Sequence, residues 1–262
     1  MSGPGDNPSP VARAPVSVCI ITKDEEENLP DCLASVRWAD EVVVVDSRST
    51  DRTRDIAASA GARVIERDFA GHVEQKNFAV SAAKHDWVLC LDADERLTPA
   101  LAESVRRALD APGASAGFEC ARLTFHLGRP IRHGGWYPDR KLRLFDRRRA
   151  KWGGRNPHDH VVADGPVGRL EGDLLHYSYR SMSDHLRQID FFTDIAAREK
   201  RARGERASAF RLVLHPVGKF LRMYLLKAGF LDGVPGFIVA VTGAYYVFLK
   251  YAKLRELERA DG

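Results

Sequence analysis

The chain has 262 residues, of which 44% are hydrophobic and 29% charged, with a formal net charge of +4. This length and composition allow one large soluble domain, or one domain with an appendage, and the small net charge does not by itself indicate a partner. The four cysteines form no Cys-x-x-Cys pair, which argues against a zinc site and favours buried thiols in a reducing compartment. Residues 1–15 are rich in Gly, Pro and Ser and lack an apolar run, so we expect a disordered leader rather than a signal peptide, and a cytoplasmic protein.

The domain expected at 16–180 begins by alternating short apolar runs with segments of helical periodicity. We predict strands at Ser17–Thr22, Glu41–Asp46, Ala62–Glu66 and Trp87–Leu91, and helices at Leu29–Trp38, Asp51–Ala60, His72–Lys84 and Thr98–Leu109. Runs that are apolar on both faces and separated by helices are typical of a mostly parallel sheet with helices on both faces. The sequence therefore predicts an α/β, Rossmann-like fold whose ligands bind beyond the carboxyl ends of the strands.

The composition and periodicity of the sequence change after this alternating part. A further strand is expected at Gly117–Leu127, and we interpret Gly128–Gly172, rich in Gly, Arg, Trp and His, as loops and short strands too polar to be a core. Helices are predicted at Ser181–Arg203, Ala207–Leu231 and Phe237–Leu257. These make 181–262 a helical C-terminal appendage.

Two carboxylates, Asp92 and Asp94, follow the strand that ends at Leu91. In an extended chain both point into the ligand crevice, where their oxygens suit Mn²⁺ or Mg²⁺ together with oxygens of a substrate diphosphate. Such an ion would neutralise charge on a leaving nucleoside diphosphate. The alternative is that Asp94 and Glu95 cap and flank the following helix.

Asp46 ends another buried strand. A carboxylate in this place can accept a hydrogen bond from a base N–H or a ribose hydroxyl. For Ser49, Thr50 and Asp51, which follow it, we expect capping of the next helix instead.

Four motifs in chain order carry a resemblance to a known family. They are Thr-Lys-Asp-Glu-Glu-Glu-Asn-Leu at the end of the first strand, then VVVVDSRSTDRT, EQKNFAV and WVLCLDADE. In this order they resemble family 2 glycosyltransferases with the GT-A fold. WYPDRKLRLFDRR, NPHDH, GDLLHYSYRS and GFLDG further resemble the bacterial lipopolysaccharide core β-1,4-glucosyltransferase subgroup.

The resemblance implies a role for each matching residue. It places Thr22 and Asp46 at a uracil base, Lys76 and Asn77 near the ribose or diphosphate, Asp92 at the ribose and sugar, and Asp94 on the metal. The chain departs from the family pattern at Asp24, where many members have Asn, and it lacks the Tyr that often follows the Thr. Both departures affect the expected base recognition rather than the fold.

Inverting transfer needs a carboxylate that takes the proton of the acceptor hydroxyl. In the resembling subgroup a His-Glu pair stands where this chain has His158–Asp159, which implies Asp159 as the general base. Asp139 is the rival, with a turn after Pro138 as its alternative role. His158 could position the diphosphate and His160 could ligate the metal, and a structural hydrogen bond is the alternative for each.

Basic residues are frequent between positions 140 and 155, beside Trp136, Tyr137 and Trp152. Because guanidinium groups suit phosphate, we expect Arg140 and Arg143 to bind the diphosphate or an anionic acceptor. A solvated basic face is one alternative. Aromatic stacking on nucleic acid is another, although nucleic acid is not the expected partner.

The C-terminal third bears on location. Val234–Leu249 is a run of sixteen residues without a charge, shorter than the roughly 20 residues of a spanning helix. Upstream, Phe210–Leu231 mixes apolar and basic residues, as in a helix that lies in a membrane interface. We expect peripheral association with the inner face of the cytoplasmic membrane. The alternatives are helices packed on the sheet domain and a homodimer contact.

Together these features predict a metal-dependent inverting glycosyltransferase. By the resemblance, it moves a sugar, glucose in the first instance, from a UDP-sugar to an anionic lipid-linked saccharide or lipopolysaccharide core acceptor. Two alternatives are a polyprenyl phosphate acceptor and a non-enzymatic basic module for anionic lipid or nucleic acid. A sugar nucleotidyltransferase is disfavoured, because Lys23, Asp24 and Glu25 stand where a Gly-rich phosphate loop would be.

Overall fold

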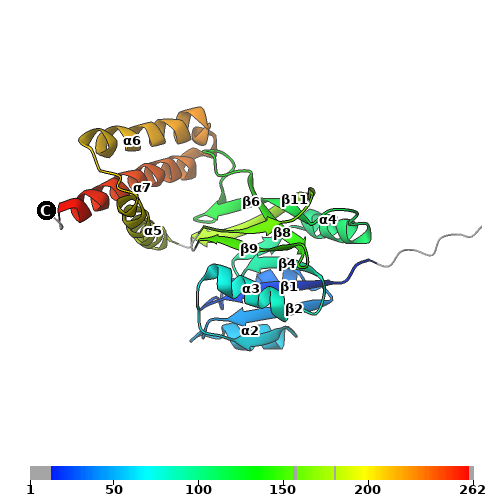
Figure 1. The fold of residues 1–262 in the computed structure, drawn as a ribbon. Helices are drawn as coiled ribbons and strands as arrows, with labels where there is room; N and C mark the ends of the chain where they lie inside the picture. Colours follow the sequence, from blue (N-terminus) through cyan, green and yellow to red (C-terminus); the bar gives the residue numbers. More distant parts are fainter. Residues whose placement is uncertain (1–12, 156–157, 180, 260–262) are drawn as a thin grey trace, which may run out of the picture. The chain divides into compact units, whose positions relative to one another are not determined.

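The computed structural model describes residues 13–155, 158–179 and 181–259 (Figure 1). Most of the leader predicted at 1–15, and Asn156 and Pro157 of the NPHDH motif, lie outside the described residues. The described residues form two compact units, one from the residues up to Arg122 together with Arg140–Leu175, the other from Leu123–Asp139 together with the described residues from His176 onward. We describe each unit by itself.

The first part of the chain alternates strands and helices as predicted. Its elements are β1 (Val16–Thr22), α1 (Leu29–Ser35), β2 (Glu41–Asp46), α2 (Thr53–Ser59), β3 (Arg63–Glu66), α3 (His72–Ala82), β4 (Trp87–Asp92), β5 (Glu95–Leu97) and α4 (Pro99–Asp110). Strands β1 to β4 are in parallel register with one another in the order β3-β2-β1-β4. Apolar residues on both faces of β1 and β2 explain this arrangement, because only a sheet covered on both sides buries them.

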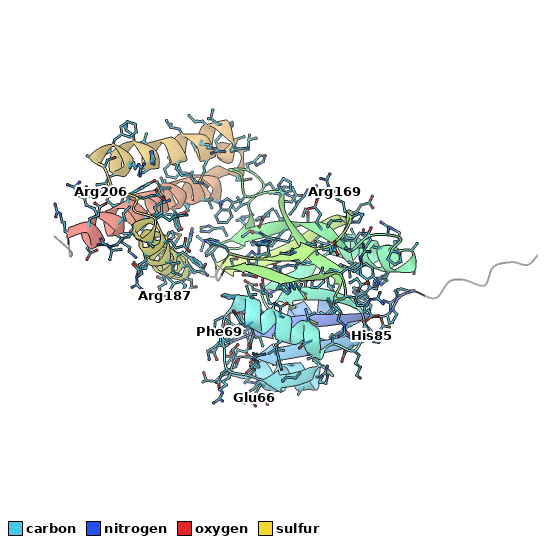
Figure 2. The ribbon with its side chains drawn as sticks, in the orientation of Figure 1. Glu66, Phe69, His85, Arg169, Arg187 and Arg206 are labelled. Atoms are coloured by element: carbon cyan, nitrogen blue, oxygen red, sulfur yellow. The ribbon has the colours of Figure 1, made fainter. Side chains whose placement is uncertain are left out.

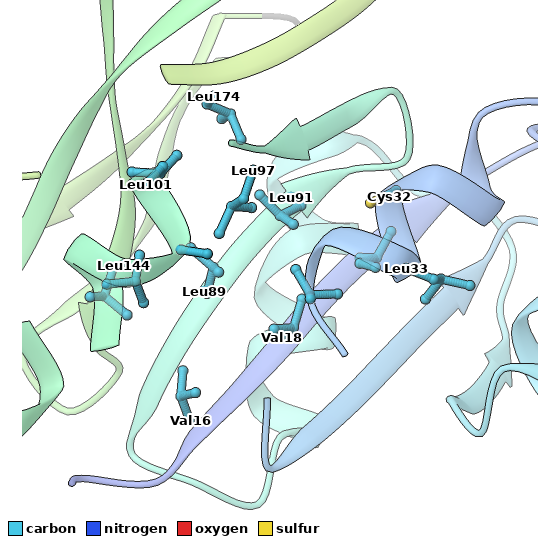
Figure 3. Packing of buried hydrophobic residues seen from close by; sticks show 14 of the residues in the cluster. Val16, Val18, Cys32, Leu33, Leu89, Leu91, Leu97, Leu101, Leu144 and Leu174 are labelled. Atoms are coloured by element: carbon cyan, nitrogen blue, oxygen red, sulfur yellow. The ribbon is translucent and has the colours of Figure 1, made fainter. Parts of the chain in front are cut away.

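Helices cover both faces of the sheet. On one face, alternate residues of β1 and β4 such as Val18 and Leu89 pack with Leu33 of α1 and Leu101 of α4 (Figure 3). On the other face, Cys19 and its neighbours pack with residues of α3. The fold is therefore the α/β, Rossmann-like type that the sequence predicts.

The later strands make the sheet mixed rather than mostly parallel. They are β6 (Gly117–His126), β7 (Arg129–Pro130), β8 (Asp139–Asp146), β9 (Ala150–Arg155), β10 (His158–Ala163) and β11 (Val167–Tyr179). The sheet continues as β4-β8-β6-β11-β5, with β8 antiparallel to β4, while β9 and β10 form a separate antiparallel hairpin. The prediction that Gly128–Gly172 is too polar for a core was wrong, because Leu144, Phe145 and Trp152 are buried.

The second unit holds the C-terminal helices α5 (Met182–Ala202), α6 (Ala209–Leu221) and α7 (Gly233–Arg259), joined by the short helical turns η1 (Arg222–Leu226) and η2 (Gly229–Asp232). Both α5 and α6 pack along α7. Asp232, from the GFLDG motif, accepts hydrogen bonds from the backbone N–H groups of Arg132 and His133 at 3.1 and 2.8 Å. This carboxylate ties the loop before β8 to η2.

Helix α7 is longer than the uncharged run in the sequence. Together with η2 it forms a stretch, Gly229–Arg259, that is the one candidate among the described residues with the length and mean hydropathy, 1.4, to cross a membrane. Only 22% of its most apolar window is buried. The sixteen uncharged residues Val234–Leu249 lie within this longer helix, which is a candidate span by length and composition only.

Candidate active site at the carboxyl edge of the sheet

The parallel register brings the predicted carboxylates to one edge of the sheet. Thr22 pairs with Asp46, and Ile21 pairs with Asp92, so all these residues lie at the carboxyl ends of their strands. Figure 2 shows the direction of the strands in its labelled residues. Glu66, at the end of β3, lies on one side of the sheet, and His85, just before β4, lies on the other. Ligands of such sheets bind at the carboxyl edge.

The loops after β1 and β2 hold each other in place at this edge. The backbone N–H groups of Asp24 and Glu25 donate to the hydroxyls of Ser49 and Thr53, at 2.9 and 2.8 Å. In return, the N–H of Thr50 donates to the Asp24 carboxylate at 2.7 Å. This bond holds the pKa of Asp24 below its usual value. Because each loop satisfies the backbone of the other, the edge is preorganised.

Asp46 and Thr22 differ in their hydrogen bonding. Asp46 is fully buried, and its two carboxylate oxygens accept from the backbone N–H and the hydroxyl of Ser49. The Thr22 Oγ1 and the Gln75 Oε1 are buried without a hydrogen-bond partner in the described part of the chain. Buried polar atoms are rarely left unpaired. Thr22 and Gln75 are therefore two polar groups at this edge with hydrogen-bonding capacity to spare.

Lys76 joins two of the predicted site residues. It projects from α3, is buried, and places its Nζ 3.0 Å from Asp92 Oδ1 and 2.8 Å from Asp159 Oδ2. Burial disfavours the charged form of Lys76, but the two carboxylates more than offset it and raise the pKa of its ammonium. The Nζ also lies 4.4 Å from the ring centroid of Trp152. Lys76 thus connects the end of β4 to the hairpin that carries Asp159.

A second buried cation lies beside this cluster. Arg143 from β8 donates to Asp92 at 3.1 Å and to Glu95 at 2.6 Å, and Arg122 is 3.3 Å from Glu95. Burial alone would lower the pKa of Arg143, yet Glu95 and Asp92 raise it. The Glu95 side chain is fully buried, so this residue is part of the cluster and not a solvated acid at a helix start.

The alternative role of Asp94 and Glu95 as a helix cap is wrong. Thr98 caps α4 instead, because its Oγ1 accepts from the Leu101 N–H at 3.3 Å and Pro99 occupies the first turn. A Thr-Pro pair before a helical run is a start signal that identifies this cap from sequence alone. The sequence holds no comparable signal for the burial of Glu95.

The structure places Asn77 close to the hairpin rather than at a polar surface. Its side-chain amide donates to the Trp152 carbonyl at 2.9 Å and accepts from the Trp152 N–H at 3.0 Å. Both ends of the amide therefore pair with the backbone of β9. This contact positions the hairpin, and with it Asp159, against α3.

The other predicted site residues lie outside the cluster of buried charges around Lys76 and Arg143. Asp94 is half-buried between β4 and β5, and His158 and His160 are exposed on β10. The Arg140 Nε lies 3.7 Å from Glu119. Asp139 is the first residue of β8, and the structure brings Asp159 together with Asp92 through Lys76.

No group of three or more His, Cys, Asp or Glu side chains that could hold a metal occurs in the described ranges. A site that takes one or two protein carboxylates and completes its shell from a diphosphate and water is the usual arrangement for Mg²⁺. The half-buried carboxylate of Asp94 fits that kind of site. The arrangement around Asp94 does not fit a metal site that is built from protein ligands alone.

The cluster around Lys76 lines a cavity of about 380 Å³ in the first unit. Its charged lining residues are Lys76, Arg122, Arg140, Lys141 and Arg143 on the basic side, and Asp92, Glu119 and Asp159 on the acidic side. Five cations against three carboxylates leave an excess of positive charge. The cavity therefore suits an anionic ligand such as a diphosphate.

Comparison with known proteins agrees with these features. The family model described as glycosyl transferase family 2 matches residues 17–193. The lipopolysaccharide core biosynthesis glycosyltransferase LpsC of Rhizobium meliloti is 32% identical over 251 residues, covering 93% of each chain. An uncharacterized glycosyltransferase of Rickettsia typhi is 32% identical over 254 residues, 92% of this chain and 87% of the relative.

Among solved structures, glucosyl-3-phosphoglycerate synthase from Mycobacterium tuberculosis, in complex with Mn²⁺, UDP-glucose and phosphoglyceric acid, is similar over 42% of this chain and 44% of its own. The TM-score is 0.37 and the identity is 22%. The two sequence comparisons above extend much further along the chain. They confirm the resemblance that the sequence motifs carry, and the chain belongs to glycosyl transferase family 2 and is a glycosyltransferase.

Proposed function

We propose that this enzyme transfers a sugar, glucose in the first instance, from a UDP-sugar to a lipid-linked or lipopolysaccharide core saccharide, with inversion and with Mn²⁺ or Mg²⁺ as cofactor. The observation that carries the proposal is the cluster in which Lys76 bridges Asp92 and Asp159 inside a basic cavity. The relative from Rhizobium meliloti, named for lipopolysaccharide core biosynthesis, supports a saccharide acceptor.

The donor would occupy the carboxyl edge of the sheet. Thr22 and Gln75 have unpaired polar atoms there for the nucleotide, and Arg140 and Arg143 line the cavity with guanidinium groups that suit a diphosphate. Asp94 would hold the metal, which when bound neutralises charge on the leaving nucleoside diphosphate. His160, exposed on β10, is a second candidate ligand.

Asp159 would take the proton of the acceptor hydroxyl. The Lys76 ammonium lies 2.8 Å from its Oδ2, and this ion pair holds the side chain in one orientation. In the described part of the chain the Oδ1 makes no hydrogen bond. That oxygen is therefore the one that can accept the proton, with Asp139 as the rival base.

The helical unit supports a location at the cytoplasmic face of the membrane. Along α6, the large apolar side chains at 210, 213, 214, 217 and 221 follow helical spacing and are all exposed. Four basic residues and no acid lie between positions 209 and 231. An apolar stripe flanked by cations fits the interface of an anionic membrane.

Donor hydrolysis tests the proposal. We expect the full chain to release UDP slowly from one UDP-sugar in a panel, with Mn²⁺ or Mg²⁺ and not with EDTA. Asp94→Ala should lower that rate roughly 100-fold or more, because a catalytic metal contributes several kcal/mol. Asp110→Ala is the matched control, since Asp110 is exposed at the end of α4 and should leave the rate unchanged. Equal rates for Asp94→Ala and wild type would remove the metal assignment.

A further inference from the structure

The second unit contains a cavity of its own, of about 230 Å³, lined from α5, α6, η1, α7, Trp136 and Tyr179. It shares no lining residue with the cavity around Lys76. Four aromatic rings contribute to its wall, those of Trp136, Tyr179, Phe192 and Tyr246. Its volume is below the roughly 300–1,000 Å³ of pockets for drug-sized ligands. The cavity therefore suits a single ring rather than an oligosaccharide.

The wall of this cavity is nearly free of charge. His185 lines it and is hydrogen-bonded to His126, with 3.0 Å between His185 Nδ1 and His126 Nε2. Burial lowers the pKa of both imidazoles, and that of His185 falls to about 4. Both rings are neutral at pH 7 as a consequence. Lys219 is then the only charged group among the lining residues.

Lys219 has no anionic partner in the described part of the chain. No hydrogen bond or ion pair joins its ammonium to another residue, and burial and the charge of Arg222 lower its pKa. The Lys250 ammonium lies 5.7 Å from the ring centroid of Tyr246. Burial and the charges of Lys200 and Lys219 lower the pKa of Lys250, although the Glu205 carboxylate partly offsets them. Lys219 is itself exposed to solvent, so an anion that enters the cavity can reach its ammonium.

We propose that this cavity binds a phosphorylated sugar ring of the acceptor, with the ring against the aromatic wall and the phosphate at Lys219. Aromatic faces provide apolar contact for the ring, and ammonium groups bind phosphate as point charges. The inference rests on the proposed function for the identity of the acceptor. It adds a recognition site for that acceptor in the helical unit.

Titration calorimetry of the full chain with glucose 6-phosphate, in the absence of donor and with excess UDP present, tests the inference. We expect binding that Lys219→Ala weakens at least about tenfold, since a hydrogen bond to a charged group contributes roughly 1.5–3 kcal/mol. Lys219→Arg should retain most of the affinity. Lys227→Ala is the control, because Lys227 is an exposed cation on the same stretch and does not line the cavity.

Glucose and inorganic phosphate, each titrated alone, should bind more weakly than glucose 6-phosphate. If phosphate alone binds as tightly, the sugar part of the inference is overturned. If Lys219→Ala changes binding to phosphatidylglycerol vesicles and leaves glucose 6-phosphate binding intact, the cation serves a lipid headgroup and the inference fails. Donor hydrolysis measured in parallel separates the two proposals. Lys219→Ala should hydrolyse the donor at the wild-type rate. If the wild type itself hydrolyses no donor, that result counts against the proposed function alone.

Discussion

At the scale of single residues, we expect Lys76 to have the largest effect on stability and activity. A buried ammonium between two carboxylates is stable only while both partners are present, because an unpaired buried charge is costly. Removing Lys76 would leave Asp92 paired with Arg143, whereas Asp159 would lose the cation with which it pairs in the cavity wall. Stability and activity therefore depend on the same side chain.

We expect Lys76→Met to lower the free energy of unfolding by about 3–5 kcal/mol and to abolish transfer. Folding raises the pKa of Lys76 above its ordinary value of 10.5. Its contribution to stability is therefore complete below that value and is lost as the pH rises through the higher folded pKa. Urea unfolding should show a constant gap between wild type and variant from pH 7 to about 9.5 that shrinks at higher pH.

Lys84→Met provides the comparison for this measurement. Lys84 follows the same helix and is exposed; its backbone N–H donates to Glu41, but its ammonium pairs with no carboxylate in the described residues. It should unfold like the wild type at every pH. A gap between Lys76→Met and wild type that widens above pH 10 would contradict the proposed ion-pair arrangement.

At the scale of elements, the β9–β10 hairpin determines where Asp159 lies. Gly154 faces Asp159 in the hairpin register and has a φ of +94°. A Cβ at this position would lie 2.5 Å from the His158 carbonyl oxygen and 2.8 Å from His160 Nδ1. A side chain there would distort both the backbone and the strand that carries Asp159.

Gly154→Ala should lower transfer activity at least about tenfold and destabilise the chain by roughly 2–4 kcal/mol, the sum of backbone strain and overpacking. The control is Gly61→Ala, because Gly61 has a similar φ of +81° with nothing within 4 Å of its Cβ position. Gly61→Ala should lose only the stability that backbone strain costs, and it should keep full specific activity. Donor hydrolysis and urea unfolding of both variants check this, and equal losses in the two would argue against a role for the hairpin geometry.

Elements that depend on local patterns could be predicted from the sequence. The strands at β1, β2 and β4 and the carboxylates at their ends follow from apolar runs and turn residues, which act within a few positions. The pairing of Lys76 with Asp159 could not be predicted, because it depends on how a hairpin 83 positions later folds against α3. The burial of Glu95 was missed for the same reason, since its partners Arg122 and Arg143 come from β6 and β8.

At the scale of the whole molecule, the exposed apolar residues are concentrated in the helical unit. Val217 on α6 and Val162 on β10 are each 51% exposed, but only Val217 belongs to a continuous stripe. Basic side chains at Lys219, Arg222 and Lys227 follow it. The two valines therefore allow a matched test of membrane association.

Val217→Glu should weaken binding to phosphatidylglycerol vesicles at least about tenfold, because it removes apolar contact and adds a repulsive charge worth about 1 kcal/mol near an anionic surface. Val162→Glu should bind like the wild type, and salt should weaken binding of the wild type. Cosedimentation measures all three. Wild-type binding by Val217→Glu would refute the α6 surface, and concentration-dependent self-association through it would favour the homodimer alternative.

The separation of Lys76 from Asp159 also has a consequence during synthesis on the ribosome. The two residues are 83 positions apart, so at about 5–20 residues per second roughly 4–17 seconds pass between their translation. During that interval the amino-terminal strands can pair while the lysine has only Asp92 as its buried partner. The proposed donor edge of the nascent chain can therefore form before the proposed base is in place, and we expect the enzyme to become competent only when the hairpin closes onto α3.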